Sequence, residues 1–386
     1  MMPVNMLRMA IRTQVCDAER VFFEDVSEED LHALYSISKS QDMAHIVAAE
    51  LEAQKILAKD EIGEKFRKQM ILSVLRYERI QYEIIEICKT LEEQKIRYML
   101  LKGALIREYY REPWMRTSAD IDVLIPEAEH ETAKMAIAEH LGYEVGAKSK
   151  HDVSMFAPSG VHLELHFGTI EEYRVANANN VMVDIWKYAV VREGYGYQYV
   201  IADELFYFYH VAHMAKHFEY GGCGIRFFLD LWLLEHRKDH SAEKRRELLE
   251  RGGLLKFAQC SARLANVWFS DGEHTDLTRR MERHVIGNGI YGSKKMNEAW
   301  QQINAGGRRK RAINMIFPPY SVMVARYSSL ADKKLLLPFC HIRRWFSIVL
   351  QGRIKNSINM LKLNSSVKKE TSERVHTMLK ELELIS

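Results

Sequence analysis

Residues 119–125 have the sequence Ala-Asp-Ile-Asp-Val-Leu-Ile, in which two carboxylates alternate with apolar side chains. The alternation predicts a β-strand, and on a strand Asp120 and Asp122 would point to the same face. Two like charges held side by side repel each other, which favours a cation between them. Magnesium prefers hard oxygen ligands such as carboxylates. The stretch therefore predicts a strand that carries a metal site.

The residues just before this strand supply charge that a phosphate group needs. Lys102 and Gly103 follow a short apolar run, and Arg116 lies shortly before Asp120. Glycine allows a phosphate to approach the backbone closely, while Lys102 and Arg116 can neutralise its charge. An ion pair with Asp120 is the alternative for Arg116. Together these parts predict metal-assisted phosphoryl or nucleotidyl transfer.

A third carboxylate lies on a second alternating run. Residues 161–167 have the sequence Val-His-Leu-Glu-Leu-His-Phe, which places His162, Glu164 and His166 on one face of a predicted strand. If this strand pairs beside the strand of Asp120, Glu164 joins the two aspartates. Three carboxylates can hold one or two Mg²⁺ ions, and a pair of ions would stabilise the entering and leaving oxygens of an in-line displacement.

The order of these motifs resembles that of the uncharacterised bacterial nucleotidyltransferase family in the DNA polymerase β-like superfamily. The motifs are Leu101-Lys102-Gly103, Arg116, Asp120-Ile121-Asp122 and Glu164-Leu165-His166. Aminoglycoside nucleotidyltransferases are similar around the glycine and the aspartate pair. The resemblance implies an α+β fold, in which a small mixed-sheet nucleotidyltransferase core is flanked by N-terminal and C-terminal helical regions.

The resemblance also implies roles for individual residues. Gly103 takes the place of the phosphate-loop glycine, and Asp120 and Asp122 take the places of metal ligands. Glu164 takes the place of the third acid, either as a metal ligand or as the general base on the acceptor hydroxyl. The superfamily usually has a second small or hydroxylated residue after the glycine, where this chain has alanine. That difference leaves one phosphate contact open, and Lys102 is the candidate to supply the charge instead.

The activity that the resemblance implies is transfer of a nucleoside monophosphate from an NTP to an unidentified acceptor, a small molecule or a protein. ATP is the expected nucleotide, and Mg²⁺ is the expected cofactor, as one or two ions, with Mn²⁺ as the alternative. The competing hypothesis is a catalytically inactive member of the fold that senses nucleotides or contacts proteins. The intact carboxylates argue against it, because a degenerate site has no need to keep repelling charges. Nucleic acid is not an expected partner, since no RNA-binding motif with interleaved aromatic residues is present.

A second constellation lies on a predicted helix. His210, His213 and His217 are spaced at i, i+3 and i+7 and form one stripe, with Lys216 adjacent. The pattern lacks the glutamate of a zinc-protease helix. We predict that this helix lines the cleft and that His213, Lys216 and His217 bind the nucleotide together with His166. Plain helix packing and a dedicated metal site are the alternatives. Further on, Arg226 and Asp230 are spaced at i and i+4 for an ion pair.

Periodicity and composition divide the chain into three parts. Residues 1–95 are predicted to form an N-terminal helical region, 96–202 the nucleotidyltransferase α/β core, and 203–386 a C-terminal helical region that becomes basic toward its end. Residues 221–224, Gly-Gly-Cys-Gly, are predicted to be a turn between helices. The predicted buried stripe near the end of the first region is Ile71, Leu72, Leu75, Ile80, Ile84, Ile85 and Ile87.

Cysteine usage and charge give further expectations. Five scattered cysteines without a Cys-x-x-Cys pair fit a reducing compartment, and no leader or spanning segment is recognised, so a cytoplasmic protein without a transmembrane segment is expected. Residues 306–386 carry 16 Lys and Arg against 5 Asp and Glu. Such a region could meet nucleic acid, an anionic membrane or an acidic partner, or could simply be solvated. Residues 335–350 mix apolar and basic side chains, and ordinary packing of an amphipathic helix is favoured over a membrane surface.

Overall fold

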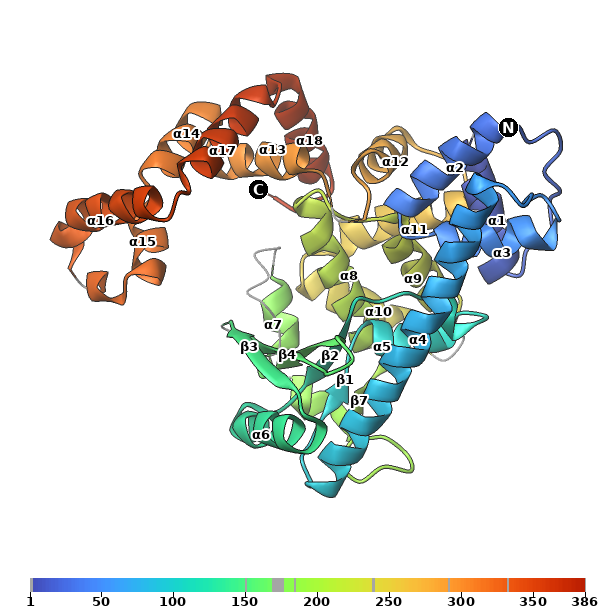
Figure 1. The fold of residues 1–386 in the computed structure, drawn as a ribbon, viewed down its shortest axis with the longest axis horizontal. Helices are drawn as coiled ribbons and strands as arrows, with labels where there is room; N and C mark the ends of the chain where they lie inside the picture. Colours follow the sequence, from blue (N-terminus) through green and yellow to red (C-terminus); the bar gives the residue numbers. More distant parts are fainter. Residues whose placement is uncertain are drawn as a thin grey trace.

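The computed structural model describes residues 3–149, 151–168, 177–183, 185–237, 240–290, 292–331 and 333–385. Helices make up most of it, and a five-stranded mixed sheet lies in the lower part of the view in Figure 1, below the N-terminal and C-terminal helices. The α+β class predicted from the sequence is therefore confirmed. The division at residues 95 and 202 stays a prediction.

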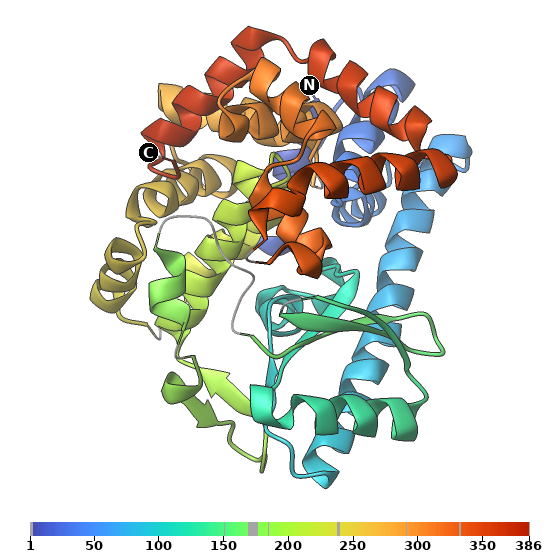
Figure 2. The ribbon, with the colours of Figure 1, turned by 90° about the vertical axis from the view of Figure 1, so that its left-hand side faces the viewer.

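The N-terminal part is helical, as the sequence predicts. Ser27 caps α2 through a reciprocal capping box with Asp30, and Asp60 caps α4 by accepting a hydrogen bond from the Gly63 N–H. The first helices pack with later ones, whereas the long helix α4 runs down to the sheet (Figure 2). The four helices are α1 (Pro3–Val15), α2 (Glu28–Ser40), α3 (Ala44–Ala53) and α4 (Glu61–Glu93).

The predicted buried stripe of α4 is only partly correct. Ile80, Ile84 and Ile87 are buried against the sheet with its other apolar residues. The rest of the stripe is exposed, because α4 is 33 residues long and the sheet covers only its C-terminal half. The N-terminal half packs on α3 through a different face. The exposed members are Ile71, Leu72, Leu75 and Ile85.

The sheet has the strand order β1-β2-β5-β4-β3, and β2 and β5 are parallel while the other neighbours are antiparallel. The strands are β1 (Met99–Leu100), β2 (Asp120–Leu124), β3 (Glu144–Lys148), β4 (Asp152–Phe156) and β5 (His162–His166). Helices α4 and α6 (His130–Leu141) pack on the apolar face. A smaller hairpin of β6 (Ala189–Val191) and β7 (Tyr199–Ile201) contacts β1.

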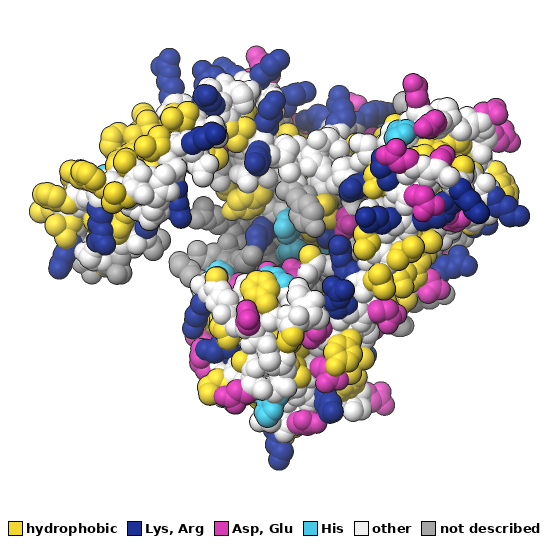
Figure 3. All heavy atoms as spheres, viewed as in Figure 1, with side chains coloured by type: hydrophobic (Ala, Val, Ile, Leu, Met, Phe, Trp, Pro, Cys, Tyr) yellow, Lys and Arg dark blue, Asp and Glu magenta, His cyan; other side chains and the backbone are white. Residues whose placement is uncertain are grey.

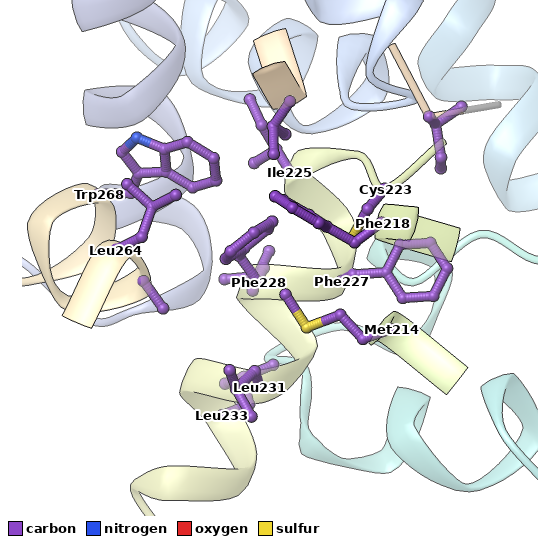
Figure 4. Close-up of a cluster of buried hydrophobic side chains, with 14 of the residues drawn as sticks. Met214, Phe218, Cys223, Ile225, Phe227, Phe228, Leu231, Leu233, Leu264 and Trp268 are labelled. Carbon is purple, nitrogen blue, oxygen red and sulfur yellow. The ribbon is translucent and has the colours of Figure 1, made fainter. Parts of the chain in front are cut away.

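The C-terminal helices share one large hydrophobic core with α1–α3. Aromatic and aliphatic side chains of α8, α9 and α11 meet at its centre, among them Phe218, Phe228 and Trp268 (Figure 4). The predicted turn at residues 221–224 separates α8 from α9. The helices of this part are α7 (Ala178–Met182), α8 (Asp203–Glu219), α9 (Ile225–Glu235), α10 (Ala242–Arg251), α11 (Leu255–Phe269) and α12 (Asp276–Asn288).

The last helices divide into a docked pair and a projecting segment. Helices α13 (Lys294–Ala305) and α18 (Lys369–Glu381) pack on each other, and α18 reaches α12. The segment between them extends away from the rest of the chain (Figure 1). It comprises α14 (Arg308–Ile316), α15 (Tyr320–Arg326), α16 (Leu337–Leu350) and α17 (Ile354–Ser366). Within the described residues, no helix combines the length and the apolarity that crossing a membrane requires.

Candidate active site

The register of β2 against β5 brings the predicted carboxylates together. In this parallel pair Asp120 lies opposite His162, and Asp122 lies opposite Glu164. The intervening Ile121 and Val123 are buried in the apolar core, so alternation sends the polar side chains to the other face. The predicted pairing of the two strands is thereby confirmed.

Asp122 is almost fully buried and is surrounded by cationic donors. The Nζ of Lys102 lies 2.6 Å from its Oδ1, and the Nε2 of His166 lies 3.0 Å from the same oxygen. Burial alone would raise the pKa of this carboxyl, but the Lys102 charge and the hydrogen bond from His166 outweigh it and lower the pKa. The pKa of His166 is raised in turn, because its hydrogen bonds to Asp122 and Glu164 outweigh the effect of burial.

Lys102 occupies an unusual backbone conformation. It joins β1 to the short helix α5 (Gly103–Ile106), with φ 47° and ψ −118°. Residues other than glycine rarely adopt positive φ, and such strain persists where the surrounding structure holds it in place. Here the strained residue carries the amine that pairs with Asp122.

Two sets of side chains are close enough to share a cation. Ligand atoms of Asp120, His162 and Glu164 lie within 4.8 Å of one another, and so do those of Asp122, Glu164 and His166. Burial and the neighbouring Asp122 charge raise the pKa of Asp120, whereas a hydrogen bond from His166 lowers that of Glu164. Glu164 belongs to both sets, so it links the two aspartates.

His162 is a candidate ligand that the sequence did not single out. Its Nε2 is buried and has no hydrogen-bond partner among the described residues. A buried nitrogen without a partner is costly, and a metal ion is one way to satisfy it. The signal was present in the alternation of 161–167, which places His162 on the same face as Glu164.

Helix α8 closes the other side of the site. A cavity of about 250 Å³ lies between this helix and the polar face of the sheet. The imidazoles and the lysine predicted to line the cleft thus share one cavity with the carboxylates. The predicted site residues in its lining are Lys102, Gly103, Arg116, Asp120, Asp122, Glu164, His213, Lys216 and His217.

The α8 side chains differ in their contacts. The Nε2 of His210 bonds the Phe227 carbonyl oxygen at 3.0 Å, which is a packing role. The Nε2 atoms of His213 and His217 lie 3.1 Å apart. Burial is the main cause that lowers both pKa values, to about 4 for His217, and so keeps this pair neutral. Burial and the Lys102 charge lower the pKa of Lys216 to about 8.

His166 lies behind the carboxylates rather than in the cavity lining. It is buried, and its Nε2 lies 3.0 Å from Asp122 and 3.5 Å from Glu164. From this position it can orient the two carboxylates. The nucleotide contact expected of it stays a prediction.

Arg116 forms its ion pair with Asp230 and not with Asp120. Its Nε lies 2.8 Å from Oδ1 of Asp230, which also accepts a hydrogen bond from the Tyr110 hydroxyl at 2.7 Å. The ion pair of Arg116 with Asp120 was therefore the wrong alternative. So was the pair of Arg226 with Asp230, because Asp230 is fully buried and already bound.

Arg226 reaches the N-terminal helices instead. Its NH1 donates to Oδ2 of Asp42 at 2.9 Å and to the Thr117 carbonyl at 3.0 Å. The Thr117 hydroxyl donates to the same Asp42 oxygen at 2.6 Å. Helix α9 is thereby fixed both to the segment before β2 and to the turn after α2.

Gly103 has a packing reason as well as the predicted phosphate role. A Cβ at this position would lie 3.3 Å from the Ser118 Cβ and 3.5 Å from the Arg116 NH1. The first distance is slightly shorter than ordinary contact and the second is ordinary, so a side chain here would require Ser118 to shift by a few tenths of an ångström. The glycine lets the segment before β2 pack closely on the start of α5.

A larger cavity lies elsewhere, among α8, α10, α11 and α12, with a volume of about 1120 Å³. The described residues that form its walls include neither of the two sets of carboxylates and histidines that could share a cation. One of its arginines, Arg245, is bound to Asp203. Chemistry rather than volume therefore selects the smaller cavity as the candidate active site.

A mixed sheet with paired carboxylates, a lysine at the strand-to-helix loop and a facing helix is the arrangement of a phosphate-handling transferase. The family of uncharacterised nucleotidyltransferases matches residues 27–270, which include the whole site. The chain belongs to this family, which supports a transferase role. The search of curated proteins finds no match.

Proposed function

We propose that this chain is a metal-dependent nucleotidyltransferase, which binds an NTP between β2, β5 and α8 and transfers its nucleoside monophosphate to an acceptor. The observation that carries the proposal is the register of Asp122 beside Glu164, with Lys102 at ion-pair distance. Buried carboxylates that face a cavity and hold a cation are expected where a substrate brings phosphate and metal together.

Asp120, Asp122 and Glu164 would hold the divalent metal, with His162 as an additional ligand to one ion. The proximity of their ligand atoms and the unpartnered Nε2 of His162 support this assignment. The carboxylate oxygens suit Mg²⁺, and they also suit Mn²⁺. When bound, the metal supplies charge stabilisation for the phosphoryl group and the leaving oxygen.

Lys102, Lys216 and the Arg116 guanidinium would face the phosphates of the NTP. All three line the cavity, and Asp230 fixes the Nε side of Arg116. His213 and His217 are held neutral and offer ring N–H donors or acceptors. A cluster of cations in a partly enclosed space attracts a polyanion and strengthens each contact with it.

The transfer itself needs a nucleophile and a base. An acceptor oxygen would attack the α-phosphorus of the NTP, and the new P–O bond would form as the bond to the β-phosphate bridging oxygen breaks. Pyrophosphate leaves, and the acceptor proton passes to a carboxylate, for which Glu164 is the candidate. His166 would hold Glu164 in place, since its Nε2 lies 3.5 Å from the carboxylate.

The test uses ATP labelled in its α-phosphate, incubated with the protein, Mg²⁺ and either small-molecule or protein fractions of a cell extract. We expect label on an acceptor together with pyrophosphate release, both absent in Asp120→Asn. ATP binding without release of pyrophosphate would favour the inactive nucleotide-sensing alternative. Absence of NTP binding would contradict the proposal. Glu164→Gln distinguishes the role of Glu164 as general base from its role as metal ligand. If Glu164 is the base, the variant keeps Mg²⁺-dependent NTP binding and loses turnover.

A further inference from the structure

The segment α14–α17, residues 308–366, is called the C-terminal arm. Its helices α14 and α17 pack on α13, whereas α15 and α16 project from the remainder of the chain and have little core of their own (Figure 1). Its buried hydrophobic cluster consists of Met323, Leu330 and Cys340, as far as the described residues show. An element with so small a core buries few of its apolar side chains in this structure.

Helix α16 turns its apolar stripe to solvent. Phe339 is 69% exposed and Phe346 is 65% exposed, and the flanking Leu335 and Leu350 are 92% and 84% exposed. Ordinary packing of this amphipathic helix, as favoured from the sequence, is therefore only partly correct, because α16 buries Cys340 and Ile348 but leaves its larger apolar stripe exposed. The partly buried Arg344 donates to the carbonyls of residues 315 and 316. The exposed stripe of α16 is Phe339, Ile342, Phe346, Val349 and Leu350.

The arm is also strongly basic. Residues 308–366 contain 12 Lys and Arg against a single Asp or Glu. Arg343 is exposed on α16 itself, and the exposed Lys333 and Arg353 lie before and after this helix. Hydrophobic and basic side chains alternate over this surface in the space-filling view (Figure 3). Exposed apolar surface rimmed by charge marks an interaction site.

We propose that the C-terminal arm docks on an anionic membrane surface, with the α16 stripe inserted at the level of the headgroups and the basic side chains paired with lipid phosphates. Charge complementarity favours this occupant. A second copy of the chain would bring two basic faces together, and their repulsion opposes a symmetric dimer. An interfacial helix typically has large apolar residues on one face and Lys or Arg beside them, which is the pattern of α16.

Vesicle sedimentation tests the proposal with the full chain and does not depend on catalysis. The probes are vesicles of phosphatidylcholine alone and of phosphatidylcholine mixed with phosphatidylglycerol in equal parts. We expect binding to the mixed vesicles at least about tenfold tighter than to the neutral ones, weakening as salt is raised. The variant Leu335→Ser, Phe339→Ser, Phe346→Ser, Leu350→Ser should lose binding by about tenfold or more, since it lacks the inserted groups.

A matched control removes exposed apolar groups elsewhere. The variant Ile71→Ser, Leu75→Ser, Ile85→Ser changes the exposed face of α4, where charges of both signs are mixed, and should bind vesicles as the unchanged protein does. Equal binding to neutral and anionic vesicles, or unchanged binding by the arm variant, would overturn the proposal. So would a dimer in light scattering that the arm variant dissociates, because a second copy would then cover the stripe. Tight binding to a nucleic acid that survives the serine substitutions, without vesicle binding, would assign the arm to a polyanion instead.

Discussion

Charged side chains are buried in the cleft, whereas apolar side chains are exposed on the C-terminal arm. Asp122 and Asp230 are almost inaccessible to solvent, while Phe339 and Leu350 are mostly exposed. Both arrangements cost free energy in an isolated chain, because buried charge loses its hydration and exposed apolar surface orders water.

The two regions differ in how that cost is offset. In the cleft the chain supplies its own partners, since Lys102 and His166 bind Asp122 and Arg116 binds Asp230. On the arm no comparable covering of the α16 stripe is present among the described residues. The comparison indicates that the side chains of the cleft are held in place by partners within the chain, whereas the α16 stripe is left uncovered for the external surface that we propose.

The largest expected effect is loss of activity in Asp122→Asn. Nucleotidyl transfer should fall by about 10³–10⁴-fold, because the variant removes one proposed ligand of a metal that would stabilise the charge of the transition state by several kcal/mol. Pyrophosphate release under saturating NTP measures the change, with circular dichroism to show that the fold is retained. Glu144→Gln on the exposed edge strand β3 is the control. If Asp122→Asn kept activity within twofold of the unchanged protein, the assignment of the cleft as the active site would be wrong.

A smaller effect is expected on stability from Asp230→Asn. The substitution leaves the buried Arg116 without its carboxylate, which should lower the free energy of unfolding by about 3 kcal/mol. Urea denaturation measures it. Asp42→Asn is the matched control, because its pair with Arg226 is partly exposed and should cost about 1 kcal/mol. If the two substitutions lowered the free energy of unfolding equally, the difference in burial between the two ion pairs would not determine their contribution to stability.

Acid should destabilise the large hydrophobic core through the buried His284 of α12. Burial lowers the pKa of His284 to about 4, so the unfolded chain binds a proton first as pH falls below about 6.5. The stability contributed by the neutral ring is complete above that pH and is lost by pH 4, for a total of about 3 kcal/mol. Unfolding of His284→Met should therefore depend less on pH than unfolding of the unchanged protein. If the free energy of unfolding depended on pH equally in the two proteins, His284 would not be the source of the acid sensitivity.

The smallest effect is expected from the four serine substitutions at Leu335, Phe339, Phe346 and Leu350. Because these side chains are exposed, the free energy of unfolding should change by less than about 1 kcal/mol. Urea denaturation of the variant and the unchanged protein gives the difference. A loss above about 2 kcal/mol would show that the stripe packs within the fold, and the contrast between arm and cleft would fail.

Local patterns in the sequence predicted the two strands that carry the carboxylates, β2 and β5, well. Alternation with a period of two is a property of neighbouring residues, so residues 119–125 and 161–167 could be assigned as strands and their polar faces identified. The pairing of Asp122 with Glu164 followed once the strands were taken as neighbours. His162 was visible on the same face but was not selected, because histidine on an alternating strand is not specific.

Long-range partners and the direction of amphipathic faces could not be predicted in the same way. Arg116 and Asp230 are separated by 114 positions, and no local pattern links them. The helical period of residues 337–350 identifies apolar positions but does not say which of them are covered: Cys340 and Ile348 are buried, whereas Phe339 and Phe346 are exposed. The same limit explains α4, where part of the predicted buried stripe extends beyond the sheet.

Calorimetric titration of an NTP in the presence and absence of Mg²⁺ tests the central claim most directly. The unchanged protein should bind ATP with Mg²⁺ at a Kd between about 1 μM and 1 mM, and at least about tenfold more weakly with the metal chelated. Asp120→Asn combined with Asp122→Asn should lose this dependence on Mg²⁺, because the metal ligands are gone while Lys102 and Lys216 remain. A double variant that binds ATP with the full Mg²⁺ dependence of the unchanged protein would contradict the account.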